Sequence, residues 1–162
     1  MERWVLLRKG ADFEAIGEKF HISPRLACLI RNRNVTGEAA IDKYLNGRAA
    51  NLNDGRLMKG MKQATAILRR KLEEGRKIRI IGDYDIDGIN ATYILLEGIE
   101  QLGGDVDSDI PDRITDGYGL NIELLKRAYE DGIDTIITCD NGIAAADEIA
   151  YGKSLGMTVI VT

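Results

Sequence analysis

Three aspartates alternate along one short segment, which follows an apolar run and ends at a glycine: Asp83, Asp85 and Asp87. In an extended segment, residues two apart project to the same side, so these carboxylates are expected to converge. Like charges held so close are costly unless a cation neutralises them, and oxygen-rich clusters select hard ions such as Mg²⁺, Mn²⁺ or Ca²⁺. The segment therefore predicts a metal site, and the alternative interpretation is a solvated acidic turn.

The same spacing fits the first half of an EF-hand calcium loop, which also places a glycine after the third acidic position. The twelfth position of such a loop needs a bidentate glutamate, and Ile94 stands there. The preceding run Ile78–Ile81 is typical of a strand, whereas an EF-hand needs a helix. The pattern therefore excludes an EF-hand.

A fourth candidate ligand, Asp140, follows the apolar run Thr135–Cys139 and precedes Asn141 and Gly142. Parallel strands expose their carboxyl ends at one edge, so Asp140 is expected to face the first three aspartates. Alone, Asp140 would be interpreted as a helix cap, with Asn141 and Gly142 forming the turn. Together with the first cluster, a shared metal ligand is the better interpretation.

Between these two acidic points lies a glycine-bearing loop with one arginine and one tyrosine, Arg113 and Tyr118. A guanidinium binds phosphate through paired hydrogen bonds, and a tyrosine ring stacks on a base. The alternative is a surface loop in which Arg113 pairs with Asp112 or Asp116. The local residues by themselves favour that alternative.

The elements that must position these residues follow from periodicity and caps. Helices are expected at Phe13–Phe20, Arg25–Arg31, Glu38–Leu45, Met58–Glu74, Ala91–Leu102, Ile122–Tyr129 and Ala144–Ser154. Strands are expected at Ile78–Ile81, Val106–Ile110, Thr135–Cys139 and Met157–Val161. This alternation predicts an α/β fold, an open parallel sheet with helices on both faces, after a helical N-terminal extension. The expected domains are 1–54 for the extension and 55–162 for the sheet.

The first two helices also suggest a function of another class. The segment Phe13–Ala27 is similar to a helix-turn-helix, in which Arg25, Arg31 and Arg33 would contact DNA. His21 occupies the turn position where a glycine is usual. A structural helix pair is the preferred interpretation, because isolated motif matches are often false.

The composition sets broad limits. A net charge of −4 argues against a generally basic DNA-binding surface, although bound dications would offset acidic ligands. No apolar run approaches the ~18 residues that a membrane span needs. Cys28 and Cys139 are too far apart in sequence to suggest a zinc site or a disulfide framework, so a cytoplasmic location is expected.

Three motifs in order, GDYDIDG, PDRITDGYGLN and TCDNGI, resemble those of the RecJ-like single-stranded-DNA exonucleases of the DHH phosphoesterase family. The resemblance implies a Rossmann-like DHH domain with a Mn²⁺ or Mg²⁺ pair. Asp85, Asp87 and Asp140 would be the catalytic ligands, joined by Asp83 from the local pattern. Nucleic acid would lie near the predicted contacts Arg113, Tyr118 and Asn141.

The resemblance also implies an activity, the removal of nucleotides from the 5′ end of single-stranded DNA with two metal ions. Other DNA-repair proteins are expected as partners. Relatives that cleave short oligonucleotides or cyclic dinucleotides supply an alternative substrate. The Asp-His-His motif that names the family is absent and is expected just after Thr162. We therefore expect a fragment with weak metal binding and little activity.

Overall fold

The computed structural model describes residues 4–5, 9–114, 116–117 and 119–162. The chain divides into two compact units, Met1–Leu57 and Met58–Thr162. Each unit is described by itself.

The first unit is helical. Its helices are α1 (Phe13–Phe20), α2 (Pro24–Asn32) and α3 (Glu38–Asn46), followed by single 3₁₀ turns at Ala49–Asn51 and Gly55–Leu57. The side chain of Asp12 caps α1 by accepting from the Ala15 amide, and Ser23 caps α2 in the same way, directly before Pro24. These local signals are why the predicted helix starts agree with the structure to within a residue.

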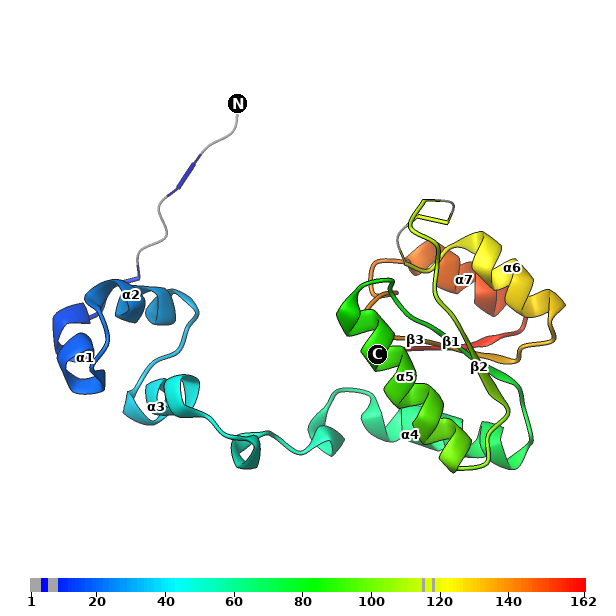
Figure 1. The fold of residues 1–162 in the computed structure, drawn as a ribbon, viewed down its shortest axis with the longest axis horizontal. Coiled ribbons are helices and arrows are strands. Elements are labelled where there is room, and N and C mark those ends of the chain that lie inside the picture. The colour runs from blue at the N-terminus through cyan, green and yellow to red at the C-terminus, as the bar shows by residue number, and fades with distance from the viewer. Residues whose placement is uncertain (1–3, 6–8, 115, 118) are drawn as a thin grey trace. The chain divides into compact units, whose positions relative to one another are not determined.

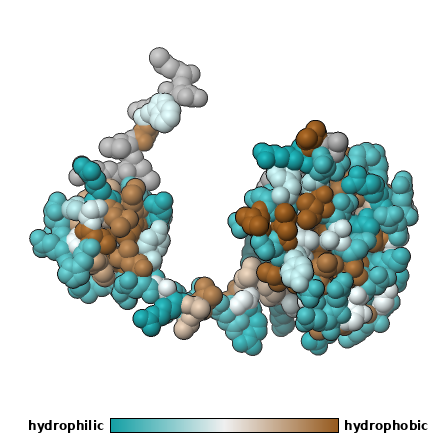
Figure 2. Space-filling view, viewed as in Figure 1, coloured by the Kyte–Doolittle hydropathy of each residue, from teal (hydrophilic) through white to brown (hydrophobic). Residues whose placement is uncertain are grey.

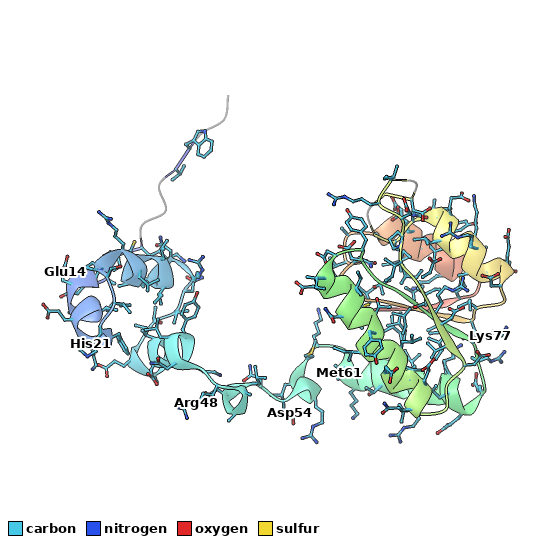
Figure 3. All side chains as sticks on the ribbon, viewed as in Figure 1. Glu14, His21, Arg48, Asp54, Met61 and Lys77 are labelled. Carbon is cyan, nitrogen blue, oxygen red and sulfur yellow. The ribbon has the colours of Figure 1, made fainter. Side chains whose placement is uncertain are left out.

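The turn between α1 and α2 is unusually tight. His21, which Figure 3 labels at the end of α1, has a left-handed backbone with φ of 55°. The Ile22 amide donates back to the carbonyl of Gly17, and a Cβ on Gly17 would lie 2.8 Å from the Ile22 carbonyl oxygen. The turn therefore joins the two helices as a close pair. A DNA-reading role for this pair stays a hypothesis.

The second unit alternates helix and strand. In chain order it contains α4 (Met61–Glu73), β1 (Ile78–Ile81), α5 (Ile86–Gln101), β2 (Val106–Asp109), α6 (Ile122–Glu130), β3 (Thr135–Thr138), α7 (Ala146–Ser154) and β4 (Thr158–Val161). All strand pairs are parallel, and the strand order is β2-β1-β3-β4. Helices α4 and α5 lie on one face, and α6 and α7 lie on the other (Figure 1). This confirms the predicted open parallel α/β sheet.

Two apolar clusters hold these layers together, because successive strand residues point to opposite faces. Ile78 and Ile80 of β1 pack with α5 residues such as Ile99 and with Leu72 of α4. On the other face, Ile81 packs in a cluster that includes Leu120, Leu124, Leu125 and Ala128. Both faces of the sheet are therefore buried, as the continuous apolar strands predict.

One charged side chain is buried within β1. Arg79 is 9% exposed, and its guanidinium donates to both carboxylate oxygens of Asp107 on the neighbouring β2, at 2.7 and 2.6 Å. A third donor group of Arg79 reaches Asp131, which follows α6, at 2.8 Å. The buried cation is thus paired on both sides, as burial of a charge requires.

The start of α5 corrects one expectation. The helix begins at Ile86, five residues before the predicted Ala91. The reason is a cap: the Asp85 side chain accepts from the amides of Asp87 and Gly88, which satisfies two of the free donors of the first turn. The acidic segment is therefore partly helical, and the premise that three extended carboxylates converge by alternation is wrong.

No helix in the described ranges is long and apolar enough to cross a membrane.

Candidate metal centre

The strand order brings the two acidic points together. The chain runs from β1 to β2 on one side and then returns to β3 on the other side of β1, so the topology reverses between β1 and β3. Open α/β sheets bind ligands at such a switch point, outside the carboxyl ends of the strands. Ile81 pairs with Thr138 in the register, and Asp83 and Asp140 each come two residues after that pair.

Three carboxylates meet at this edge. Asp83, Asp85 and Asp140 each offer a carboxylate oxygen, and these atoms all lie within 4.8 Å of one another. Asp83 is 3% exposed, whereas Asp85 and Asp140 are solvent-exposed. Such a group of oxygens suits a hard divalent cation.

The backbone around the cluster explains how the carboxylates are held. A Cβ on Gly88 would lie 2.5 to 2.7 Å from Asp83 atoms, so only glycine lets the first turn of α5 pack against Asp83. Both capping bonds of Asp85 go to its Oδ1 atom, which leaves Oδ2 for a ligand. Asp140 has a left-handed backbone with φ of 59°, a conformation that aspartate tolerates better than most residues.

The electrostatics show a crowded anionic site. Partial desolvation, followed by the negative charges of Asp85, Asp87 and Asp83, raises the pKa of Asp140 above its usual value. Asp87 is exposed in the first turn of α5 and is not part of the three-oxygen group, although its charge reaches Asp140. A cation in the cluster would relieve this repulsion.

Asn141 ties the two central strands together below the cluster. It is 8% exposed, and its side-chain amide donates to the carbonyl oxygens of Ile81 and Cys139, both at 3.1 Å. The Thr138 hydroxyl donates to the Asn141 carbonyl oxygen at 3.1 Å. Within the described residues, Asn141 Oδ1 is buried without a hydrogen-bond partner. The predicted contact of Asn141 with nucleic acid stays a prediction.

The arginine of the loop after β2 lies beside the acidic segment. The Cζ atom of Arg113 is 5.3 Å from the ring centroid of Tyr84, which stands between Asp83 and Asp85. The sequence interpretation assigned no role to Tyr84, because nothing local links it to a residue so far along the chain. Tyr118, the predicted stacking residue, lies outside the described residues.

Asp116, one of the two alternative partners of Arg113, has contacts with other residues. Asp116 accepts from the Asp112 amide at 3.0 Å, and one of its oxygens lies 3.6 Å from a guanidinium nitrogen of Arg127 on α6. Arg127 also reaches Asp109 at the end of β2. These contacts link the middle of the loop to α6, and α6 to the end of β2.

The sequence of the second unit matches the model of a known protein family. Residues 77–162 match the model described as "DHH family, N-terminal domain". The chain belongs to the DHH family. The matched DHH region begins just before β1 and contains the whole sheet and all four candidate ligands.

Proteins similar to this chain belong to the group that its three sequence motifs resemble. The single-stranded-DNA-specific exonuclease RecJ of Bacillus subtilis (strain 168) is 37% identical over 161 residues, which are 99% of this chain and 20% of that protein. The corresponding exonuclease of Escherichia coli (strain K12) is 30% identical over 163 residues and 28% of its length. The chain thus spans less than a third of the length of these relatives.

Solved structures agree with the fold. A crystal structure of exonuclease RecJ bound to manganese has a TM-score of 0.61 and 39% identity, over 65% of this chain and 27% of that chain. RecJ from Thermus thermophilus in complex with Mn²⁺ has a TM-score of 0.59 and 28% identity, over 98% and 22% of the two chains.

Proposed function

We propose that this chain forms part of a metal-dependent phosphodiesterase that removes nucleotides from the 5′ end of single-stranded DNA. One observation carries the proposal: carboxylates that follow β1 and β3 converge within 4.8 Å at the switch point of a DHH-family sheet. The exonuclease names of its relatives support the substrate.

The proposed metal ligands are Asp83, Asp85 and Asp140, with Asp87 as the predicted fourth. The ion is proposed to be Mn²⁺ or Mg²⁺, and the manganese in similar RecJ structures supports this choice. A pair of such ions held by these carboxylates would supply the positive charge that positions a phosphate, activates a water molecule and stabilises the leaving oxygen. The carboxylates themselves fix the ions and supply the negative charge that retains them.

Arg113 is proposed to hold a phosphate of the DNA strand. Its guanidinium lies over Tyr84, within the acidic segment, so a cation stands next to the place where the scissile phosphate would bind. Charge-assisted hydrogen bonds from arginine to phosphate are short and strong. Tyr118 and Asn141 are proposed as further contacts with nucleic acid.

The cysteines bear on the location of the protein. Cys28 and Cys139 are free thiols, which suits a reducing compartment, and we propose the cytoplasm. Contacts with other DNA-repair proteins stay a prediction.

Calorimetric titration with Mn²⁺ tests the centre. Asp85→Asn and Asp140→Asn remove one charge each while keeping the local backbone, because asparagine caps helices and tolerates a left-handed conformation. Each should weaken Mn²⁺ binding by at least about tenfold. Asp105→Asn makes the same charge change at the opposite edge of the sheet, before β2, and should have no effect. If all three variants weakened Mn²⁺ binding equally, the loss would reflect net charge alone, and the proposed metal centre would be wrong.

The substrate is tested separately, by fluorescence anisotropy in Mn²⁺. A 5′-phosphorylated single strand should bind more tightly than the same sequence as a blunt duplex, and Arg113→Ala should weaken that binding by about tenfold or more. Tighter binding of a cyclic dinucleotide than of the single strand would favour the alternative substrate class.

A further inference from the structure

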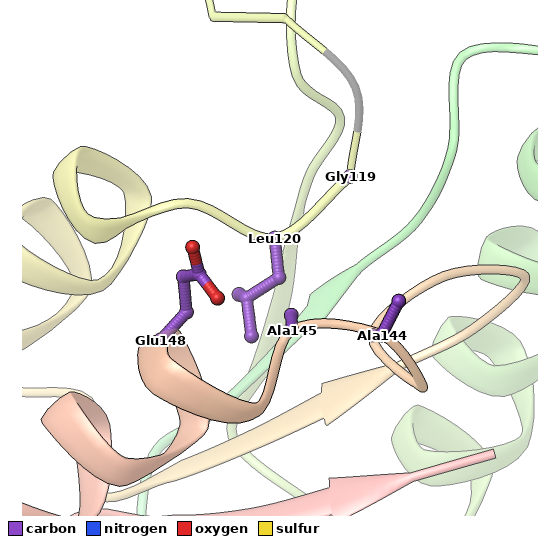
Figure 4. Close-up of a pocket in the computed structure, with 6 residues that line it drawn as sticks. Gly119, Leu120, Ala144, Ala145 and Glu148 are labelled. Atoms are coloured by element: carbon purple, nitrogen blue, oxygen red, sulfur yellow. The ribbon is translucent and has the colours of Figure 1, made fainter.

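A pocket of about 200 Å³ opens between the residues that precede α6 and those that follow β3 (Figure 4). It is lined by Gly119, Leu120, Gly142, Ala144, Ala145 and Glu148. Gly142 comes two residues after Asp140, so their Cα atoms are at most about 7 Å apart. The pocket therefore adjoins the candidate metal centre without sharing any of its ligands.

Four of the six lining residues are glycine or alanine, so much of the wall lies close to the main chain. Gly142 has φ of +91°, and a Cβ there would lie 2.5 Å from the Thr138 hydroxyl oxygen. Gly119 has φ of +72°, and a Cβ there would lie 3.5 Å from Asn141 Cβ. The positive φ favours glycine at both positions, and at Gly142 a side chain would also clash with Thr138. Ala144 and Ala145 complete a wall on which a flat ligand can lie close to the main chain.

One charged group faces this space. In Figure 4 the Glu148 carboxylate points from α7 towards Leu120, into the pocket. Within the described part of the chain, Glu148 forms neither an ion pair nor a side-chain hydrogen bond. Its carboxylate accepts hydrogen bonds and repels anions, so the ligand must bring a donor group. A second phosphate site is therefore a poor match, whereas a sugar hydroxyl or a base amino group is a good one.

We propose that this pocket binds the nucleoside part of the nucleotide whose phosphate lies at the carboxylate cluster. This inference rests on the proposed function and adds to it a subsite for one sugar and base. The small walls contact the apolar faces of the ring, and Glu148 accepts a hydrogen bond from the nucleoside. Carboxylates accept in the same way from base amino groups in other complexes.

Backbone amide shifts of the 162-residue chain give a direct test. Deoxycytidine alone and deoxycytidine 5′-monophosphate with Mg²⁺ should both shift the amides of Gly119, Gly142 and Glu148. Ala144→Leu fills the pocket and should weaken binding of the monophosphate by at least about tenfold. Ala150→Leu makes the same change on the exposed part of α7, away from the pocket, and should leave binding within about twofold.

Two further arms identify the donor. Glu148→Ala should weaken binding by about tenfold, as loss of a charged hydrogen bond does. If the donor is the base amino group, thymidine should bind the wild type as weakly as deoxycytidine binds Glu148→Ala. If the donor is the sugar hydroxyl, 2′,3′-dideoxycytidine should bind the wild type as weakly as deoxycytidine binds Glu148→Ala.

The outcomes separate this inference from the function on which it rests. If Mn²⁺ binds through Asp140 but neither probe shifts the lining amides, the subsite is refuted and the metal centre stands. Equal affinities of the Ala144→Leu and Ala150→Leu variants would refute the subsite as well. If deoxycytidine shifts the lining amides while Mn²⁺ fails to bind, the pocket stands and the proposed metal chemistry does not.

Discussion

The guanidinium of Arg113 lies over the ring of Tyr84. In the sequence, Tyr84 stands between the candidate metal ligands Asp83 and Asp85. A cation near an aromatic face at an exposed site gains about 0.5–1 kcal/mol. We propose that Tyr84 holds the arginine at the acidic edge and places it for a phosphate. In this proposal Tyr84 is a positioning residue, because it acts through Arg113.

Tyr84→Leu should accordingly weaken binding of a 5′-phosphorylated single strand by about two- to fivefold, while Tyr84→Phe, which keeps the ring, should bind more tightly than Tyr84→Leu. Mn²⁺ affinity should not change in either variant. Anisotropy titrations and a double-mutant cycle with Arg113→Ala measure the coupling. Fully additive effects of Tyr84→Leu and Arg113→Ala would show that the ring does not act through the arginine.

Helix α5 is the element that sets the geometry of the centre, since its first turn contains Asp87 and is capped by Asp85. The turn packs on Asp83 through Gly88, whose missing side chain allows the contact. The same helix leaves large apolar side chains exposed, among them Ile86, Ile89 and Ile94. Figure 2 shows hydrophobic patches on the visible face of the second unit.

Gly88→Ala should weaken Mn²⁺ binding by about tenfold although no carboxylate is removed, because the new Cβ displaces Asp83 from α5. Gly98→Ala is the matched control on the same helix. A Cβ at Gly98 meets nothing within 4 Å, so this variant should keep its metal affinity and gain about 0.5–1 kcal/mol of stability. Calorimetry and urea unfolding measure both. Unchanged Mn²⁺ affinity in Gly88→Ala would mean that the packing does not position the ligand.

Within the second unit, an ion pair away from the candidate metal centre links helix α4 to the sheet. Lys71 of α4 is 2.6 Å from Asp134, which precedes β3, and their side chains are 11% and 24% exposed. Burial alone would raise the pKa of Asp134, but hydrogen bonds from Lys71 and Thr135 outweigh it and lower that pKa. The pair thus fastens α4 to the amino end of the central strands.

A lowered pKa means that the folded chain binds the proton of Asp134 more weakly than the unfolded chain does. The stabilisation is therefore fully present above the ordinary aspartate pKa of about 4 and is lost as the pH falls through the lowered value. Asp134→Asn should cost about 1–3 kcal/mol at pH 7 and less at pH 3. Urea unfolding of both proteins across this range measures the difference. A difference that stays constant with pH would contradict the assigned ion pair.

The sequence alone determined those features that depend on neighbours along the chain. The apolar runs of β1 and β3, the cap at Ser23, and the acidic segment with its glycine predicted the α/β class and a hard-metal site. The three motifs predicted the family. Such signals need no long-range contact, since periodicity and capping act within a few residues.

The tertiary structure decided which of these residues meet. Strand order places β3 against β1, and only this pairing brings Asp140 to Asp83. The contact of Arg113 with Tyr84 and the pocket beside Glu148 likewise join segments far apart in the chain. Pairing between distant strands depends on how whole faces pack and on which loops can close, and no local pattern in the sequence encodes that choice.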